Sequence, residues 1–238
     1  MSRFDDLARY AAEIAPVIDV VHVGVHAASR SPGRELVARW DGDPGLLIDL
    51  RYVLPARPLT REGLAAVYRY DPVGEEEIAE QVGRGVLTDE DGALRATGRA
   101  LEFIVELYGV HAAATAALWA PHAARVPVLA DLAGRLLAAG GRSGGPAFAQ
   151  VCPPYEPEGT PAGVLLFNRL AALRLHRADA HAAAWSAAGL TARQIVAMPP
   201  GPARDAIEAE TNRRAAPPYE TLTAPERETL LEGLRVLL

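Results

Sequence analysis

The chain has 238 residues, half of them hydrophobic, which is enough for one large or two small domains with a sizeable core. All 24 basic residues are arginine, and the formal net charge of −6 disfavours nonspecific attraction to the phosphate backbone of nucleic acids. Cys152 is the single cysteine, which excludes an intramolecular disulfide and a thiolate-rich zinc site. We therefore predict a globular, cytoplasmic protein for which nucleic acid is not the default partner.

The sequence also argues against export and membrane insertion. Residues 1–30 have acidic side chains near their start and lack the basic-then-apolar order of a signal peptide. No run of about 18 apolar residues offers a transmembrane helix. We therefore expect no membrane association.

The region before residue 60 is predicted to form several short elements. Apolar positions from Phe4 to Ile14 have helical spacing, and Pro16 is expected to end that helix. Residues 17–25 are rich in β-branched side chains and fit either a strand or a buried helical turn. The following predictions are a break at 31–33, a short helix over 34–40, a loop at 41–45, a short strand or helix over 46–54 and a proline-rich bend at 55–58.

Residues 60–119 have the order of elements of a winged helix-turn-helix module. Thr60 is placed to cap the first of these helices, with Glu62 in its first turn. The predicted elements are a helix from Thr60 to about Tyr70, a helix over 74–82, a two-stranded wing at 86–88 and 93–97 around the tight turn 89–92, and a long helix from Gly98 to Trp119.

The charge of that module argues against DNA binding. Its second helix, which would be the recognition helix, begins Glu75-Glu-Glu77 and continues to Glu80. The wing adds the acidic residues 89–91. Carboxylates at the entry to a major groove repel the phosphate backbone, so the sequence favours a winged-helix shape without DNA binding.

The rest of the chain is predicted to be helical. A Gly/Pro-rich linker over 140–162 separates an N-terminal region, 1–139, from a C-terminal half-module, 163–238. Further helices are expected over 123–139, 164–188, 191–198, 203–215 and 225–238. The fold class we predict is mainly α, with winged-helix-like modules, a small β-hairpin wing and, as an open alternative, a degenerate tandem repeat.

From Ile14 onward the sequence resembles a poorly characterised actinobacterial family of helix-turn-helix-like proteins. The residues that carry the resemblance are Leu175-His-Arg-Ala-Asp-Ala-His181, Ala187-Ala-Gly-Leu190 and Glu208-Ala-Glu-Thr-Asn-Arg-Arg-Ala-Ala-Pro-Pro-Tyr219. The resemblance implies tandem winged-helix-like halves, the second centred on the helix with the two histidines. Between Met198 and Arg204 this chain has Pro-Pro-Gly-Pro in place of the family's further helix and wing. The family implies no established reaction.

The densest chemistry of the sequence lies on the predicted helix over 164–188. At 100° per residue, one face of this helix carries two cations, a titratable base and an aromatic wall, namely Arg174, Arg177, His181 and Trp185. Such a row is typical of a ligand pocket. The alternative interpretation is a core helix whose buried polar groups are satisfied by local pairs.

His176 lies on another face of the same helix. It lines up with Asp179 at i+3, which could orient the imidazole and set its tautomer. The separation of His176 and His181 is i,i+5 rather than the i,i+4 of a zinc helix, so no metal is expected here.

Further candidates lie in the N-terminal region. His22 and His26 point to the same side whether their segment is helical or extended, and a polar pocket wall is favoured over zinc because no acidic ligand follows at a fixed spacing. Tyr68 and Tyr70 would close over a ligand, or else belong to the core.

We favour a cofactor-independent enzyme of specialised metabolism. Arg174 and Arg177 would hold a small anionic or polar metabolite, while His181 or His176, with Asp179, moves a proton in an elimination, ring closure or isomerisation. The sequence has no flavin, nicotinamide or nucleotide fingerprint, so we expect no cofactor. Two alternatives stay open: a ligand-responsive winged-helix transcriptional regulator, and a non-catalytic partner subunit in a homodimer or hetero-complex.

Overall fold

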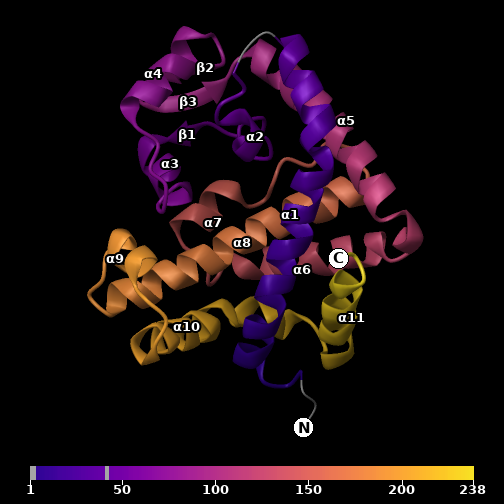
Figure 1. Ribbon diagram of the computed structural model, residues 1–238, viewed down its shortest axis with the longest axis vertical. Helices are drawn as coiled ribbons and strands as arrows, with labels where there is room; N and C mark the ends of the chain where they lie inside the picture. Colours follow the sequence, from indigo (N-terminus) through magenta and orange to yellow (C-terminus); the bar gives the residue numbers. More distant parts are fainter. Residues whose placement is uncertain (1–3, 41–42) are drawn as a thin grey trace.

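The computed structural model describes residues 4–40 and 43–238, which are mainly helical with one small antiparallel sheet (Figure 1). The helices are α1 (Leu7–Trp40), α2 (Leu47–Leu50), α3 (Arg61–Val67), α4 (Glu75–Gly83), α5 (Gly98–Leu118), α6 (Val126–Gly140), α7 (Pro146–Val151), α8 (Ala162–Ala187), α9 (Ala192–Ala197), α10 (Pro202–Ala215) and α11 (Ala224–Arg235). The strands and 3₁₀ helices are β1 (Leu59–Thr60), β2 (Leu87–Glu90), β3 (Ala93–Ala96), η1 (Ala120–His122) and η2 (Pro217–Thr221).

Helix α8 crosses the middle of the molecule (Figure 1). It packs most extensively against α6 and α10, and also against α7, α1 and α5. Helices α2, α3 and α4 and the sheet gather at one end, and we call residues 47–96 the small lobe. Helices α9 and α10 lie towards the opposite end, and α11 packs against α1 and α6. The central position of α8 brings its side chains into contact with several distant parts of the chain.

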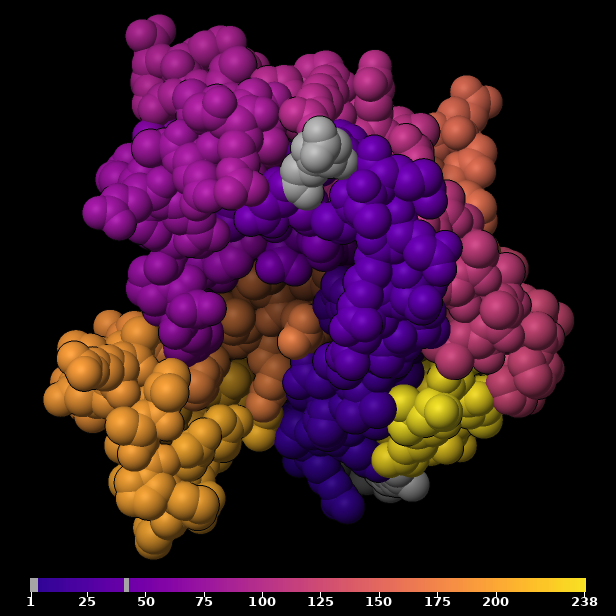
Figure 2. Space-filling view, turned by 45° about the horizontal axis from the view of Figure 1, so that its top comes forward, coloured from indigo at the N-terminus to yellow at the C-terminus, as the bar shows by residue number. Residues whose placement is uncertain are grey.

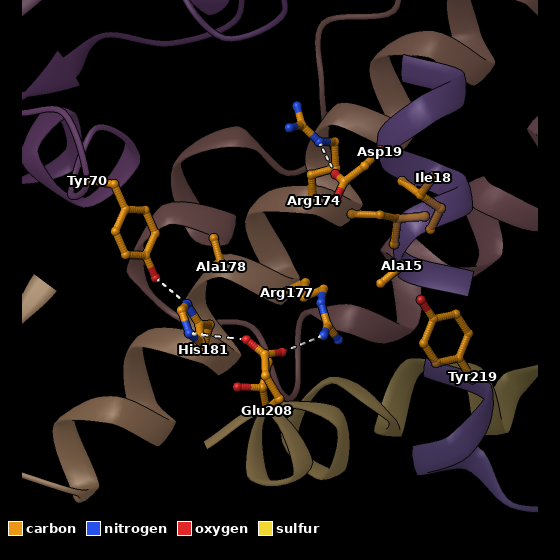
Figure 3. A pocket seen from close by; sticks show the side chains of 12 residues that line it. Ala15, Ile18, Asp19, Tyr70, Arg174, Arg177, Ala178, His181, Glu208 and Tyr219 are labelled. Atoms are coloured by element: carbon orange, nitrogen blue, oxygen red, sulfur yellow. Dashed lines mark hydrogen bonds and ion pairs between the residues drawn. The ribbon is translucent and has the colours of Figure 1, made fainter. Parts of the chain in front are cut away.

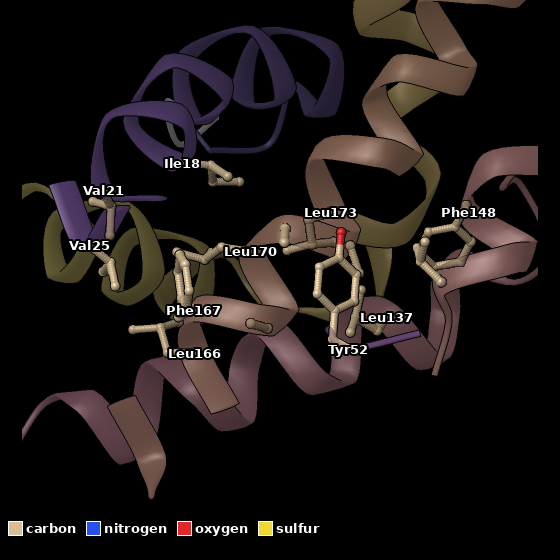
Figure 4. Close-up of a cluster of buried hydrophobic side chains, with 14 of the residues drawn as sticks. Ile18, Val21, Val25, Tyr52, Leu137, Phe148, Leu166, Phe167, Leu170 and Leu173 are labelled. Atoms are coloured by element: carbon tan, nitrogen blue, oxygen red, sulfur yellow. The ribbon is translucent and has the colours of Figure 1, made fainter. Parts of the chain in front are cut away.

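Besides a small separate cluster of Ala184, Ile195 and Ile207, the described residues form one large hydrophobic core. Its buried residues extend from Phe4 to Leu237. Figure 4 shows Phe167 of α8 near Val21 of α1, and Phe148 of α7 belongs to the same cluster. Because neighbours surround α8, apolar side chains occur around the helix instead of along one stripe.

Residues 7–40 form a single helix, which corrects the prediction of separate short elements. Helix α1 continues through Pro16 and Pro32 instead of ending or breaking there. An interior proline removes one backbone hydrogen bond and costs about 3 kcal/mol. Helix α1 packs against α5, α8, α10 and α11 and buries apolar side chains from Tyr10 to Leu36, which offsets that cost. The predicted loop 41–45 lies partly outside the described residues.

The small lobe has the predicted hairpin and a third strand. Strands β2 and β3 pair antiparallel around Asp91 and Gly92, whose φ values of 52° and 82° suit a two-residue hairpin turn. Thr60 caps α3 by accepting a hydrogen bond from the backbone N–H of Gly63 at 3.0 Å. Strand β1 pairs with β3 and gives the order β1-β3-β2. Strand β1 could not be predicted from the sequence, because two residues are too few to show an alternating pattern.

The region 140–162, predicted to be a flexible linker, contains helix α7 and belongs to the core. Phe148 and Val151 are fully buried. A Cβ atom at Gly144 would collide with the ring of Phe148, so a glycine is needed here for the backbone to lie close to that ring. The Gly/Pro composition of 140–162 therefore reflects tight packing as well as turns.

The C-terminal part is helical, as predicted, and its helices are capped. Thr191 and Gln194 form a capping box at the start of α9, and Gly189 follows α8 with φ 74°. In the described part of the chain no strand follows Ala96. A second wing, which tandem winged-helix halves would require, is therefore not present among these residues.

Helices α1 and α5 are each long and apolar enough to cross a membrane by length and mean hydropathy, although neither is the uninterrupted apolar run expected of a transmembrane helix. In the relevant stretches, 39% and 33% of the residues are buried. Core helices of soluble proteins meet the same criterion, so the two helices are weak grounds for assigning a membrane.

Candidate functional site

A cavity of about 220 Å³ opens over α8, between α1 and α10. Figure 2 shows a hollow beside α1, between the small lobe and the α9–α10 end, with α8 at its floor. We call this cavity the His181 pocket. Its polar and charged lining includes Asp19, Tyr70, Arg174, Arg177, His181 and Glu208 (Figure 3).

Successive turns of α8 supply one wall of the pocket. Arg174, Arg177 and His181 all line it, as expected for side chains on one helical face. Ala178, which lies between them, also lines the pocket, and its small side chain leaves the space open. Three of the four residues of the predicted row, all except Trp185, thus line the cavity.

Tyr70 and His181 form a hydrogen-bonded pair at the pocket wall. The Tyr70 hydroxyl lies 2.8 Å from Nδ1 of His181, and Nε1–H of Trp185 donates to the Tyr70 oxygen at 3.2 Å. Because Trp185 can only donate, the Tyr70 proton is available for His181. We therefore assign Nδ1 of His181 as the acceptor of the Tyr70 proton, which places the imidazole proton on Nε2. Trp185 therefore acts behind Tyr70 instead of lining the pocket.

The far nitrogen of His181 faces a carboxylate. Its Nε2 atom is buried without a hydrogen-bond partner among the described residues and lies 3.7 Å from Oε1 of Glu208 (Figure 3). Burial lowers the pKa of His181, and Glu208 opposes that shift. Burial also raises the pKa of Tyr70, with the hydrogen bond from Trp185 acting the other way. Both groups are therefore neutral near pH 7, and Glu208 is placed to stabilise a protonated His181.

Both arginines of the row are already paired with carboxylates. Arg174 donates from Nε to Asp19 at 2.6 Å, and Arg177 donates to Glu208 at 3.3 Å. Arg177 also donates to the side-chain oxygen of Asn212 at 2.8 Å. A purely anionic ligand would have to compete with these carboxylates for the arginines. The contacts therefore argue against the prediction that Arg174 and Arg177 bind an anion on their own.

His176 and Asp179, predicted to form a catalytic pair, bind other groups outside the pocket lining. Nε2 of His176 lies 2.9 Å from Oγ of Ser143. The carboxylate of Asp179 accepts hydrogen bonds from Arg69 and from the backbone N–H groups of Ala147 and Phe148, at the start of α7. Both side chains are buried. Asp179 holds Arg69 and the start of α7 and makes no hydrogen bond to His176, so these contacts do not support the predicted pairing.

The predicted residues of the N-terminal region are also placed away from the His181 pocket, except Tyr70. Nδ1 of His22 accepts a hydrogen bond from Arg174 at 3.0 Å, and the rings of His22 and His26 lie 4.7 Å apart. Burial lowers the pKa of His22 to about 2 and that of His26 to about 4. The Tyr68 hydroxyl donates to Asp49 at 3.3 Å.

No candidate metal site was found among the described residues, where no group of three or more His, Cys, Asp or Glu side chains has a suitable arrangement. His22 and His26 thus have no third ligand of these types.

Comparison with known proteins gives no guide to function, so the function is argued from the geometry of the pocket. No family model, curated protein or solved structure matches the chain. The family resemblance carried by residues 175–181 and 208–219 accordingly stays a prediction.

Two acidic residues of the pocket, Asp19 and Glu208, were not among the predicted site residues. Asp19 lies on α1 and Glu208 on α10, and both face arginines of α8 across more than 30 positions of sequence. Neither has a local motif, since Glu208 occurs in a mixed-charge helix and Asp19 within an apolar segment. Only the packing of α1 and α10 on α8 brings them to the His181 pocket.

Proposed function

We propose that the protein binds a small polar metabolite in the His181 pocket and catalyses a proton transfer on it, as a cofactor-independent lyase, isomerase or cyclase. The observation that carries this proposal is the hydrogen-bonded pair of Tyr70 and His181 at a cavity wall, with Glu208 beside the far imidazole nitrogen. Tyr70 has a proton to donate and Nδ1 of His181 has the lone pair that accepts it, and two such neutral groups in contact are suited to general acid–base catalysis.

The proton steps use the residues present. The Tyr70 hydroxyl gives its proton to Nδ1 of His181 while the Tyr70 oxygen takes a proton from a carbon atom of the ligand. His181 becomes an imidazolium, and its charge lies near the carboxylate of Glu208. Return of the proton to a second ligand atom completes an isomerisation. Return to a leaving group completes an elimination, and in both cases the enzyme regains its starting protonation.

The charge and size of the pocket narrow the class of ligand. Asp19 and Glu208 balance Arg174 and Arg177, so a ligand needs no net charge. The volume of about 220 Å³ equals roughly seven water molecules at about 30 Å³ each. It lies below the range of about 300–1,000 Å³ that is typical of drug-sized ligands. A small uncharged or zwitterionic molecule therefore fits better than an anion.

A second candidate function, a transcriptional regulator, is favoured by the order of elements in the small lobe and α5, which resembles that of a winged-helix module. The elements follow the order β1-α3-α4-β2-β3-α5, and the sheet order is β1-β3-β2. The charges favour a scaffold without DNA binding, because Arg61 is bonded to Glu75 and Asp89, and Arg84 is bonded to Glu80. These arginines are engaged by acidic groups of the same face and are not free for phosphates.

Solvent hydrogen exchange tests the catalytic proposal for any ligand, because a reversible proton transfer at carbon leaves deuterium in the molecule. The chain is incubated in D₂O with a panel of small polar metabolites, and NMR records both binding and deuterium incorporation at carbon. We expect at least one bound compound to exchange a C–H hydrogen. Tyr70→Phe and His181→Gln should each lower the exchange rate by about 10²–10⁴-fold, the usual contribution of a positioned acid or base.

The matched control is His122→Gln, which changes a partly exposed histidine of η1 outside the pocket and should leave exchange unchanged. Exchange that persists in both pocket variants would contradict the proposal. Binding of a compound without any exchange would instead favour the ligand-responsive regulator.

A further inference from the structure

A second, larger cavity lies between α1 and α5, next to the small lobe. Its volume of about 510 Å³ is within the range of about 300–1,000 Å³ that is typical of small-molecule sites. Much of its wall is apolar, with Phe103 and Leu107 from α5 opposite Val37 from α1, and Ile48 from α2. Helices α1 and α5 are seen side by side in Figure 1. We call this space the α1–α5 cavity.

Two buried polar groups of its wall have no partner. Oγ of Ser29 and Nδ1 of His111 make no hydrogen bond with a described residue, although these residues are only 6% and 1% exposed. Buried polar atoms are almost always hydrogen-bonded, because an unpaired one retains the cost of its lost hydration. Both residues line the cavity, so a ligand with a hydroxyl or carbonyl group could satisfy them.

The surroundings of the cavity are cationic. Arg30 and Arg34 line it, are exposed, and form no ion pair with a described residue. Behind the wall, buried Arg51 is held by neutral groups, the carbonyl of Ile48 at 2.6 Å and the side-chain oxygen of Asn168 at 3.2 Å. The carboxylate of Asp49 accepts a hydrogen bond from Tyr68 and opposes the lowering of the pKa of His26, a residue that also lines the cavity. An anion is therefore favoured in or near this space.

The histidines add hydrogen-bonding groups rather than charge. His26 and His111 have ring centroids 6.3 Å apart, and both pack against Phe167. Burial lowers the pKa of His111 to about 2, and the charge of Arg51 acts in the same direction. Positive charge at the cavity thus comes from arginine, while its inner polar groups are neutral.

We propose that the α1–α5 cavity is a binding site for an amphipathic organic anion. The apolar body of the ligand lies against Phe103 and Leu107, a hydroxyl or carbonyl oxygen meets Ser29 and His111, and a carboxylate faces Arg30 and Arg34. This inference is independent of the acid–base function proposed for the His181 pocket, with which the cavity shares no lining residue.

Three probes separate the parts of this proposal. Isothermal titration calorimetry with the full chain would use decanoate, decanol and ω-hydroxydecanoate. We expect saturable binding of decanoate, at least fivefold weaker binding of decanol because it lacks the carboxylate, and tighter binding of ω-hydroxydecanoate because its hydroxyl reaches the unpaired polar groups. Absence of saturable decanoate binding, or equal affinity for decanoate and decanol, would overturn the proposal.

Exposed arginines provide variants that should fold normally. The double variant Arg30→Gln/Arg34→Gln should weaken decanoate binding about tenfold and leave decanol binding unchanged, as expected for two partly solvated charges. Arg39→Gln is the matched control, because Arg39 is an exposed arginine of the same helix that pairs with Glu106 and does not line the cavity. Equal decanoate affinity in the double variant and the wild type would overturn the assignment of the carboxylate.

Discussion

Two residues of α8 with a single residue between them, Asp179 and His181, have different roles because their partners differ. The carboxylate of Asp179 is buried and accepts hydrogen bonds from Arg69 and from the first backbone N–H groups of α7. His181 reaches a cavity and contacts Tyr70. A helical turn of 100° per residue separates the two side chains by about 200°, which sends one into the core and the other to the pocket.

Asp179→Ala should therefore destabilise the fold strongly. It removes the carboxylate partner of the largely buried Arg69 and the acceptor of two backbone N–H groups of α7, and loss of one partner from a buried ion pair costs about 3–5 kcal/mol. Urea denaturation measures the change in the free energy of unfolding. Asp179→Asn keeps an oxygen acceptor and should lose less.

The exposed control Glu228→Ala, on α11, should change the free energy of unfolding by less than about 0.5 kcal/mol. A loss below about 1 kcal/mol for Asp179→Ala would show that this carboxylate does not hold α7 in place.

At the scale of elements, local signals predicted what local interactions determine. The caps at Thr60 and Thr191, the Asp-Gly turn of the hairpin and the long helices were all readable from the sequence. Helix α1 was not, because proline is a strong local signal against a helix and only packing against four other helices overrides it. Helix α7 was not predicted either, because its surroundings have the glycine and proline content of a linker and its packing against α8 and α3 is a long-range effect.

Pro16→Ala tests whether α1 is continuous. Pro16 is exposed, so the change removes no core packing, while alanine restores a backbone hydrogen bond within the helix. We expect a gain of about 1–3 kcal/mol in the free energy of unfolding. Pro225→Ala is the control, because proline in the first turn of α11 costs that helix nothing. An unchanged or lower stability of Pro16→Ala would indicate that the helix ends at Pro16.

At the scale of the whole molecule, some residues of the candidate site lie on one helix, and the others come from distant parts of the sequence. Spacing on one helix was enough to predict that Arg174, Arg177 and His181 share a face, since their order depends on helical geometry alone. Their partners Asp19, Tyr70 and Glu208 come from three distant segments. These contacts depend on how α1, α10 and the small lobe pack on α8, which periodicity does not encode. In our proposal they also narrow the expected ligand from a small anionic or polar metabolite to a small uncharged or zwitterionic molecule.

The central claim is that Tyr70 and His181 form a neutral acid–base pair, and ¹⁵N NMR of the imidazole nitrogens tests it without a ligand. Titration of the ¹⁵N-labelled chain should show an unprotonated Nδ1 and a protonated Nε2 for His181 at pH 7, with a pKa below the ordinary 6.5. Tyr70→Phe, which removes the hydroxyl donor, should shift the Nδ1 resonance and assign the contact. A pKa at or above 6.5, or a proton on Nδ1 at pH 7, would contradict the account.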